Sequence, residues 1–107
     1  MKTTYSERIP QRKEDYRLIQ EYTNQLEEIL GSSSDNVHVQ WDNQQDEMNQ
    51  PVYLLSLQFG EWEVSGRFTP DELRSHHHVM FRLYRLWGDL LHKENQTRIE
   101  KLISQGD

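Results

Sequence analysis

The feature that most constrains the fold is a pair of alternating apolar segments, residues 52–59 and 62–68, which are separated by only two residues. Apolar side chains at every second position are typical of a strand with one buried face. The separating residues are Gly60 and Glu61, and a glycine in the first position favours a type II′ hairpin turn. Such a turn fixes which residues face each other, because paired residues must lie at equal distances from it.

This register predicts that the apolar side chains of the two strands share one face. The expected pairs on that face are Phe59 with Trp62, Leu57 with Val64, Leu55 with Gly66, and Tyr53 with Phe68. Because glycine has no side chain, the space opposite Leu55 is expected to accept a side chain from a helix. The other face of the hairpin is mostly polar, so we expect it to be exposed to solvent.

A helix and another strand are expected before the hairpin. Apolar residues at steps of three and four predict a helix over about residues 11–30, with Pro10 at its start and Gly31 at its end. Alternation over residues 37–41 predicts a short strand. The following segment, residues 42–51, is polar and rich in Gln and Asn, which predicts a long loop.

The helix expected after the hairpin has a well-marked start and a wide apolar face. Thr69, Pro70 and Glu72 form the pattern of a capping box with proline in the first helical position. Two apolar stripes follow at helical spacing. Their members are Leu73, His77, Met80, Tyr84, Trp87 and Leu91 in the first stripe, and Val79, Leu83, Leu86 and Leu90 in the second. A second capping pattern at residues 97–100 leaves open a separate short helix over residues 98–104.

Together these elements predict an α+β fold of order α-β-β-β-α, in which two helices cover one face of a three-stranded antiparallel sheet. We expect residues 1–9 to be a flexible N-terminus and residues 10–105 to form a single domain. The order of the elements resembles that of double-stranded-RNA-binding domains. Those domains contact phosphate through basic groups, whereas the last predicted helix starts with Asp71 and Glu72. We therefore reject that function.

The distribution of charge favours a basic partner. The net charge is −6, and residues 18–66 contain no Lys or Arg but nine acids. Such a field repels nucleic acids and membrane surfaces and attracts basic proteins. The simpler interpretation is that these acids only keep a small domain in solution. If they bind a partner, we expect the contacts to come from the strands and their loops. The candidates are Asp42, Asp46, Glu47, Glu61 and Glu63.

Nothing in the sequence indicates catalysis or a cofactor. The chain has no cysteine, which excludes thiol catalysis and thiolate metal sites. Successive residues of a helix point about 100° apart, so His76, His77 and His78 cannot converge on one metal ion. The sequence has no phosphate-binding loop, nucleophile elbow or zinc-protease motif. We therefore expect no enzymatic activity, no cofactor and no metal site.

The sequence also bears on the compartment. The N-terminal residues lack the apolar run of a signal peptide, and no segment approaches the roughly 18 apolar residues that a membrane helix needs. We expect a cytoplasmic protein.

The main functional hypothesis is a small acidic protein-binding module, such as an adaptor, chaperone or inhibitor, that presents its acids to a basic protein. Small inhibitors carried by phages or other mobile elements have a similar size and charge. This is an analogy with a class of proteins and names no particular family. One alternative is a homodimeric structural subunit that pairs through Val79, Leu83, Leu86 and Leu90. A second alternative is a metal- or pH-responsive regulator that uses His38 and the histidines at 76–78.

Overall fold

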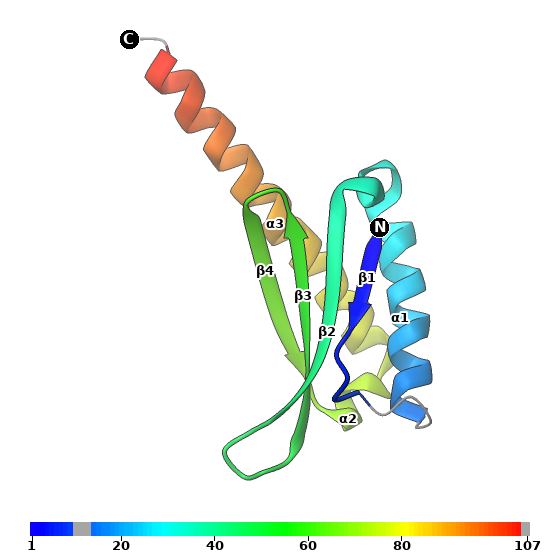
Figure 1. The fold of residues 1–107 in the computed structure, drawn as a ribbon. Helices are drawn as coiled ribbons and strands as arrows, with labels where there is room; N and C mark the ends of the chain where they lie inside the picture. The colour runs from blue at the N-terminus through cyan, green and yellow to red at the C-terminus, as the bar shows by residue number, and fades with distance from the viewer. Residues whose placement is uncertain (10–13, 106–107) are drawn as a thin grey trace.

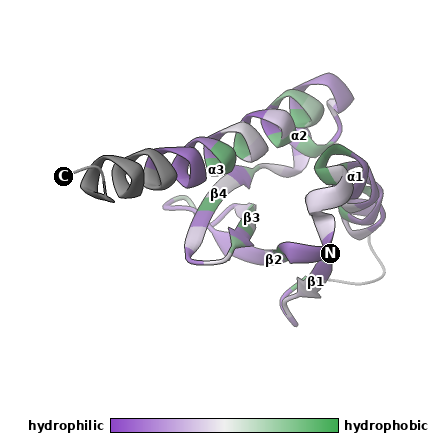
Figure 2. Ribbon diagram, turned by 90° about the horizontal axis from the view of Figure 1, so that it is seen from above, coloured by the Kyte–Doolittle hydropathy of each residue, from purple (hydrophilic) through white to green (hydrophobic). Residues whose placement is uncertain are grey.

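A four-stranded mixed sheet with helices on one face forms the fold in the computed structural model (Figures 1 and 2). The structure describes residues 1–9 and 14–105, with side chains through residue 96. The strands lie in the order β1-β2-β3-β4. The strands are β1 (Lys2–Tyr5), β2 (Val37–Gln45), β3 (Pro51–Phe59) and β4 (Trp62–Phe68). The helices are α1 (Glu14–Leu30), the 3-10 helix η1 (Gly31–Asn36), α2 (Pro70–Leu73) and α3 (His76–Gln105). The predicted α+β class and the central antiparallel strands are confirmed.

The β3–β4 hairpin has the predicted register and turn. Phe59 pairs with Trp62, and the pairing continues without a slip to Tyr53 and Phe68. Gly60 has a φ angle of 61°, while Glu61 is not among the residues with positive φ. This combination is that of a type II′ turn, which matches the right-handed twist of the strands.

The apolar face of the sheet forms the core together with α1 and α3. Leu55, Leu57 and Phe68 are fully buried there. The space opposite Leu55 is filled as predicted, because a Cβ placed on Gly66 would lie 3.1 Å from the Arg82 guanidinium and 3.4 Å from a methyl group of Leu86. α3 therefore packs closely against β4.

The N-terminus differs from the expectation of a flexible segment. Lys2–Tyr5 forms the edge strand β1, which pairs in parallel with residues 38–41 of β2. Ile9 is also buried in the core. A parallel pair with a strand more than thirty residues away has no local sequence signal, which explains the error. The predicted helix start at Pro10 lies outside the described residues, whereas the predicted end, with Gly31 at a φ of 57°, is confirmed.

The predicted loop at residues 42–51 is shorter than expected. β2 continues to Gln45 and pairs with β3 back to Pro51. The polar residues of this segment extend the hairpin through backbone hydrogen bonds, which do not require apolar side chains. Only residues 46–50 form the connection.

The helical segment after β4 starts where predicted but is interrupted. The capping box is present, since the Thr69 hydroxyl accepts from the Glu72 amide and the Glu72 carboxylate accepts from the Thr69 amide. However, α2 ends at Leu73 and α3 begins at His76. α3 then runs without a break to Gln105, so there is no separate short helix after residue 97.

The interruption changes which face of α3 is buried. The stripe that we assigned to a dimer contact, Val79, Leu83, Leu86 and Leu90, is buried in the core of the single chain. This corrects the prediction that these residues face a second copy. In the first stripe, Tyr84 is 59% exposed. The sequence pattern treats Leu73 and the residues after it as one continuous helix. The two non-helical residues between α2 and α3 rotate α3 relative to that pattern, so a different face of the helix meets the core.

Candidate functional site

The two ends of the sheet differ in how their charges are arranged. Val37, at the start of β2, pairs with Phe59, at the end of β3. The short helix η1 leads directly from α1 into Val37. This connection places the end of α1, η1 and the β3–β4 turn at the same end of the molecule (Figure 1).

Four exposed carboxylates lie at this end, which we call the acidic end. They are Glu27, Glu28, Asp35 and Glu61. Within the part of the chain that the structure describes, none of them forms an ion pair or a side-chain hydrogen bond. Glu63 is nearby on β4, and its backbone carbonyl accepts a hydrogen bond of 3.0 Å from Lys93. Lys2 also lies near this end, since it pairs with His38.

At the opposite end, arginines pair with some of the acids, while Asp46, Glu47 and Asp71 have no ion pair with a described residue. The guanidinium of Arg74 lies 3.1 Å from a carboxylate oxygen of Asp15 and 4.0 Å from Glu14. Asp15 also accepts a hydrogen bond of 2.6 Å from the hydroxyl of Tyr53. Burial of the Tyr53 hydroxyl, together with this bond to a carboxylate, raises the pKa of Tyr53 well above its ordinary value. These groups tie α1, β3 and α2 together.

Glu72 is the centre of a second network at that end. It lies 2.8 Å from a ring nitrogen of His78 and 3.5 Å from the guanidinium of Arg82. The pKa of Glu72 is lowered, first by the hydrogen bond from the Thr69 amide and then by the Thr69 hydroxyl and its contacts with His78 and Arg82, against an opposing effect of burial. Its charge is therefore used to hold the start of α2 and α3 in place.

The five acids predicted from the sequence do not form one cluster. Asp46 and Glu47 lie in the β2–β3 connection, and Asp46 accepts hydrogen bonds of 2.9 Å from the amides of Met48 and Gln50. Glu61 lies beyond the other end of β3, whose nine residues span about 30 Å.

The remaining two of these acids are also separate. Asp42 is half-buried within β2, and Glu63 follows Trp62 on β4. Sequence reasoning did not group Glu27, Glu28 and Asp35 with Glu61. The signal for that grouping was the short connection between the first helix and the first predicted strand.

His38 lies apart from the other histidines, which are all on α3. His38 is on β2, where its ring nitrogen lies 2.9 Å from the hydroxyl of Thr4. The ring of His76 lies 6.1 Å from that of Tyr22, between ring centroids. Among the described residues, no three His, Cys, Asp or Glu side chains are placed to hold a metal ion.

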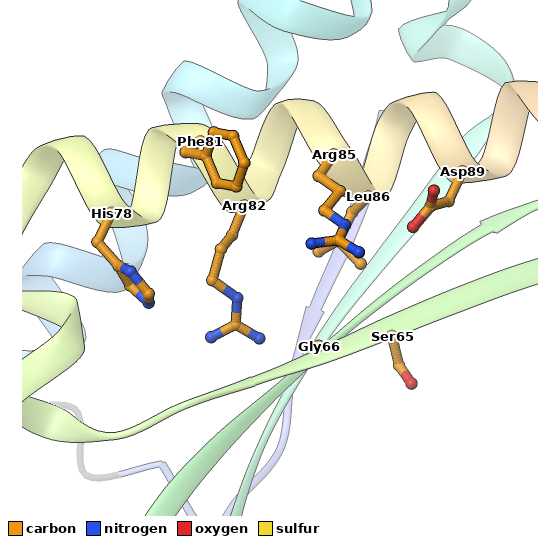
Figure 3. Close-up of a pocket in the computed structure, with 8 residues that line it drawn as sticks. All are labelled: Ser65, Gly66, His78, Phe81, Arg82, Arg85, Leu86 and Asp89. Atoms are coloured by element: carbon orange, nitrogen blue, oxygen red, sulfur yellow. The ribbon is translucent and has the colours of Figure 1, made fainter.

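A groove of about 390 Å³ lies between α3 and β4 (Figure 3). Its lining includes Ser65, Arg82, Arg85, Leu86 and Asp89. Figure 3 shows Arg82 and Arg85 extending from the helix toward the strand. Arg82 lies 4.0 Å above the ring of Phe68. It also donates a hydrogen bond to the backbone carbonyl of Arg67, so this arginine belongs to the packing of α3 on β4.

Comparisons with protein-family models, curated proteins and solved structures found no match to this chain. Within the described ranges, none of the helices combines the length and the apolar character needed to cross a membrane.

Proposed function

We propose that the protein is a non-enzymatic binding module, of the adaptor, chaperone or inhibitor type, whose acidic end binds a basic protein. The observation that carries this proposal is the contrast between the two ends. At the end near α2, arginines lie beside Glu14, Asp15 and Glu72, although Asp46, Glu47 and Asp71 at that end have no ion pair with a described residue. At the acidic end, no cationic partner among the described residues lies beside any of its four acids, Glu27, Glu28, Asp35 and Glu61.

The position of two of these acids adds support. Glu27 and Glu28 lie in the last turn of α1, which has no basic residue. The carbonyl groups at the end of a helix carry a partial negative charge, so carboxylates there are unfavourable. A local arrangement that costs stability without a compensating contact is typical of a functional surface. A basic partner would supply the missing positive charge.

Affinity capture from a lysate of the native host tests the proposal. The bait is the tagged full chain at low and at high salt, compared with a variant that carries Glu27→Gln, Glu28→Gln, Asp35→Asn and Glu61→Gln. We expect the wild type to retain a basic protein at low salt and to release it at high salt, because exposed charges are screened. The variant should not retain it.

A matched control removes the same number of charges elsewhere. It carries Glu7→Gln, Glu14→Gln, Glu47→Gln and Asp71→Asn, all at exposed positions. This control should still capture the basic protein. If the wild type captures no basic protein, or if both variants lose it equally, the acidic end is not the binding surface.

A further inference from the structure

The outer edge of the sheet at β4 has hydrogen-bonding groups that no strand uses. A two-residue hairpin turn makes Phe59 and Trp62 a hydrogen-bonded pair, and such pairs alternate along the strands. The backbone N–H and C=O groups of Glu63, Ser65 and Arg67 therefore point away from β3. In agreement, the carbonyl of Glu63 accepts from Lys93 and that of Arg67 accepts from Arg82.

The sequence of β4 is self-complementary about Ser65. If two copies of the strand pair antiparallel with Ser65 opposite Ser65, then Glu63 of one copy faces Arg67 of the other, twice. The same register makes Ser65 with Ser65 and Glu63 with Arg67 the hydrogen-bonded pairs. These are the residues whose backbone groups point outward, so the strand can pair in this register without rearranging its backbone.

The bonds from α3 to the edge do not block this pairing. They occupy the carbonyls of Glu63 and Arg67, while no hydrogen bond from the described residues occupies either backbone group of Ser65. A carbonyl oxygen has two lone pairs and can accept a second bond. Arg82 can therefore keep its bond to the carbonyl of Arg67, and the long, exposed side chain of Lys93 can shift to accommodate a second strand.

The α3 helices of the two copies are also complementary to each other in this two-fold arrangement. Antiparallel pairing about Ser65 has its two-fold axis normal to the sheet, which keeps both α3 helices on one side and makes them antiparallel. Asp89 and Leu86 line the groove on both sides of Ser65. Arg85 and Asp89 are exposed, are one helical turn apart and have no ion pair with a described residue. Arg85 of one copy can thus face Asp89 of the other.

We propose that the chain forms a two-fold dimer in which β4 pairs with β4 of a second copy and the α3 helices lie side by side over the joint. The occupant of the α3–β4 groove is then a second copy of this chain, selected by two Glu63–Arg67 and two Arg85–Asp89 pairs. Phe81, which is 66% exposed and lines the same groove, becomes partly covered. None of the four acids of the acidic end takes part in these pairs, so different variants test the two proposals and either proposal can fail without the other.

Charge reversal tests the register directly. Sedimentation equilibrium of the full chain should show a dimer, and Glu63→Arg or Arg67→Glu should each weaken it by about tenfold or more, because like charges then face each other twice. The double variant, Glu63→Arg with Arg67→Glu, should restore dimerisation. Both side chains are exposed, so circular dichroism is expected to show the wild-type fold in each variant.

A backbone variant tests the strand pairing independently of charge. Ser65→Pro removes an amide that the monomer does not use and should abolish the dimer while the monomer stays folded. The proposal is wrong if the wild type remains a monomer at the highest concentration reached. It is also wrong if both single charge-reversal variants dimerise as tightly as the wild type, because the chains would then associate through another surface.

Discussion

The indole N–H of Trp41 donates a hydrogen bond of 2.9 Å to the hydroxyl of Thr23, and this bond joins β2 to α1 inside the core. The hydroxyl in turn donates to the carbonyl of Ile19 at 2.7 Å. Both side chains are buried, with Trp41 fully inaccessible to solvent. A buried indole can therefore pack at the centre of this small core because the helix offers its polar atom a partner.

Thr23→Val should lower the free energy of unfolding by about 1–3 kcal/mol, because it leaves the buried Trp41 N–H without an acceptor while keeping the shape of the side chain. Urea denaturation gives the value. The same change in a Trp41→Phe background should cost much less, since the unsatisfied donor is then absent. An equal cost in both backgrounds would show that the hydrogen bond is not the cause.

Thr69→Ala should cost about 1 kcal/mol of stability, because it removes the acceptor for the Glu72 amide at the start of α2. Thermal and urea denaturation can both measure the loss. Thr69→Ser keeps the hydroxyl and serves as the control, which should retain most of the stability. If the serine variant lost as much as the alanine variant, the effect would lie in packing and not in the cap.

Two glycines provide a matched test of backbone conformation. A Cβ on either Gly31 or Gly88 would meet no atom within 4 Å, but Gly31 has a φ of 57°. Gly88→Ala should stabilise the chain by about 1 kcal/mol, since it lies inside α3 and alanine favours the helix. Gly31→Ala should destabilise it by about 1 kcal/mol, because an L side chain disfavours positive φ. Changes of the same sign in denaturation experiments would contradict this account.

The lowered pKa of Glu72 makes part of the stability depend on pH. A carboxyl whose pKa is lower in the folded state contributes stability above its ordinary pKa of 4.5, and the contribution is lost as the pH falls through the folded value. The stability difference between the wild type and Glu72→Gln should therefore be larger at pH 7 than at acidic pH. Urea denaturation over this range measures it, with Glu47→Gln as the exposed control. A difference that stays constant with pH would be inconsistent with this role.

Local signals in the sequence were sufficient to predict the central hairpin and the helix start. Gly60 determines the turn, the alternation around it determines the register, and Thr69 marks the cap. Each of these signals acts over a few residues. The space opposite Leu55 also followed from the register alone, because the pairing with Gly66 is a consequence of the turn.

The features that the sequence did not reveal depend on contacts between residues far apart in the chain, or on an interruption of a helix that shifts its periodicity. β1 pairs with residues far along the chain, and its own residues lack an apolar alternation. The gap between Leu73 and His76 rotates the face of α3, so the apparent dimer stripe became core. The candidate site also depends on a distant contact, because the pairing of Val37 with Phe59 is what places Glu61 at the same end of the molecule as the acids of α1 and η1.

Chemical-shift mapping by NMR with a short lysine-rich peptide at low salt tests the central claim most directly. The proposal predicts that the backbone amide signals of Glu27, Glu28, Asp35 and Glu61 shift most and that these shifts fade as salt is added. The largest shifts at Asp46 and Glu47, or an absence of shifts at the acidic end, would contradict it.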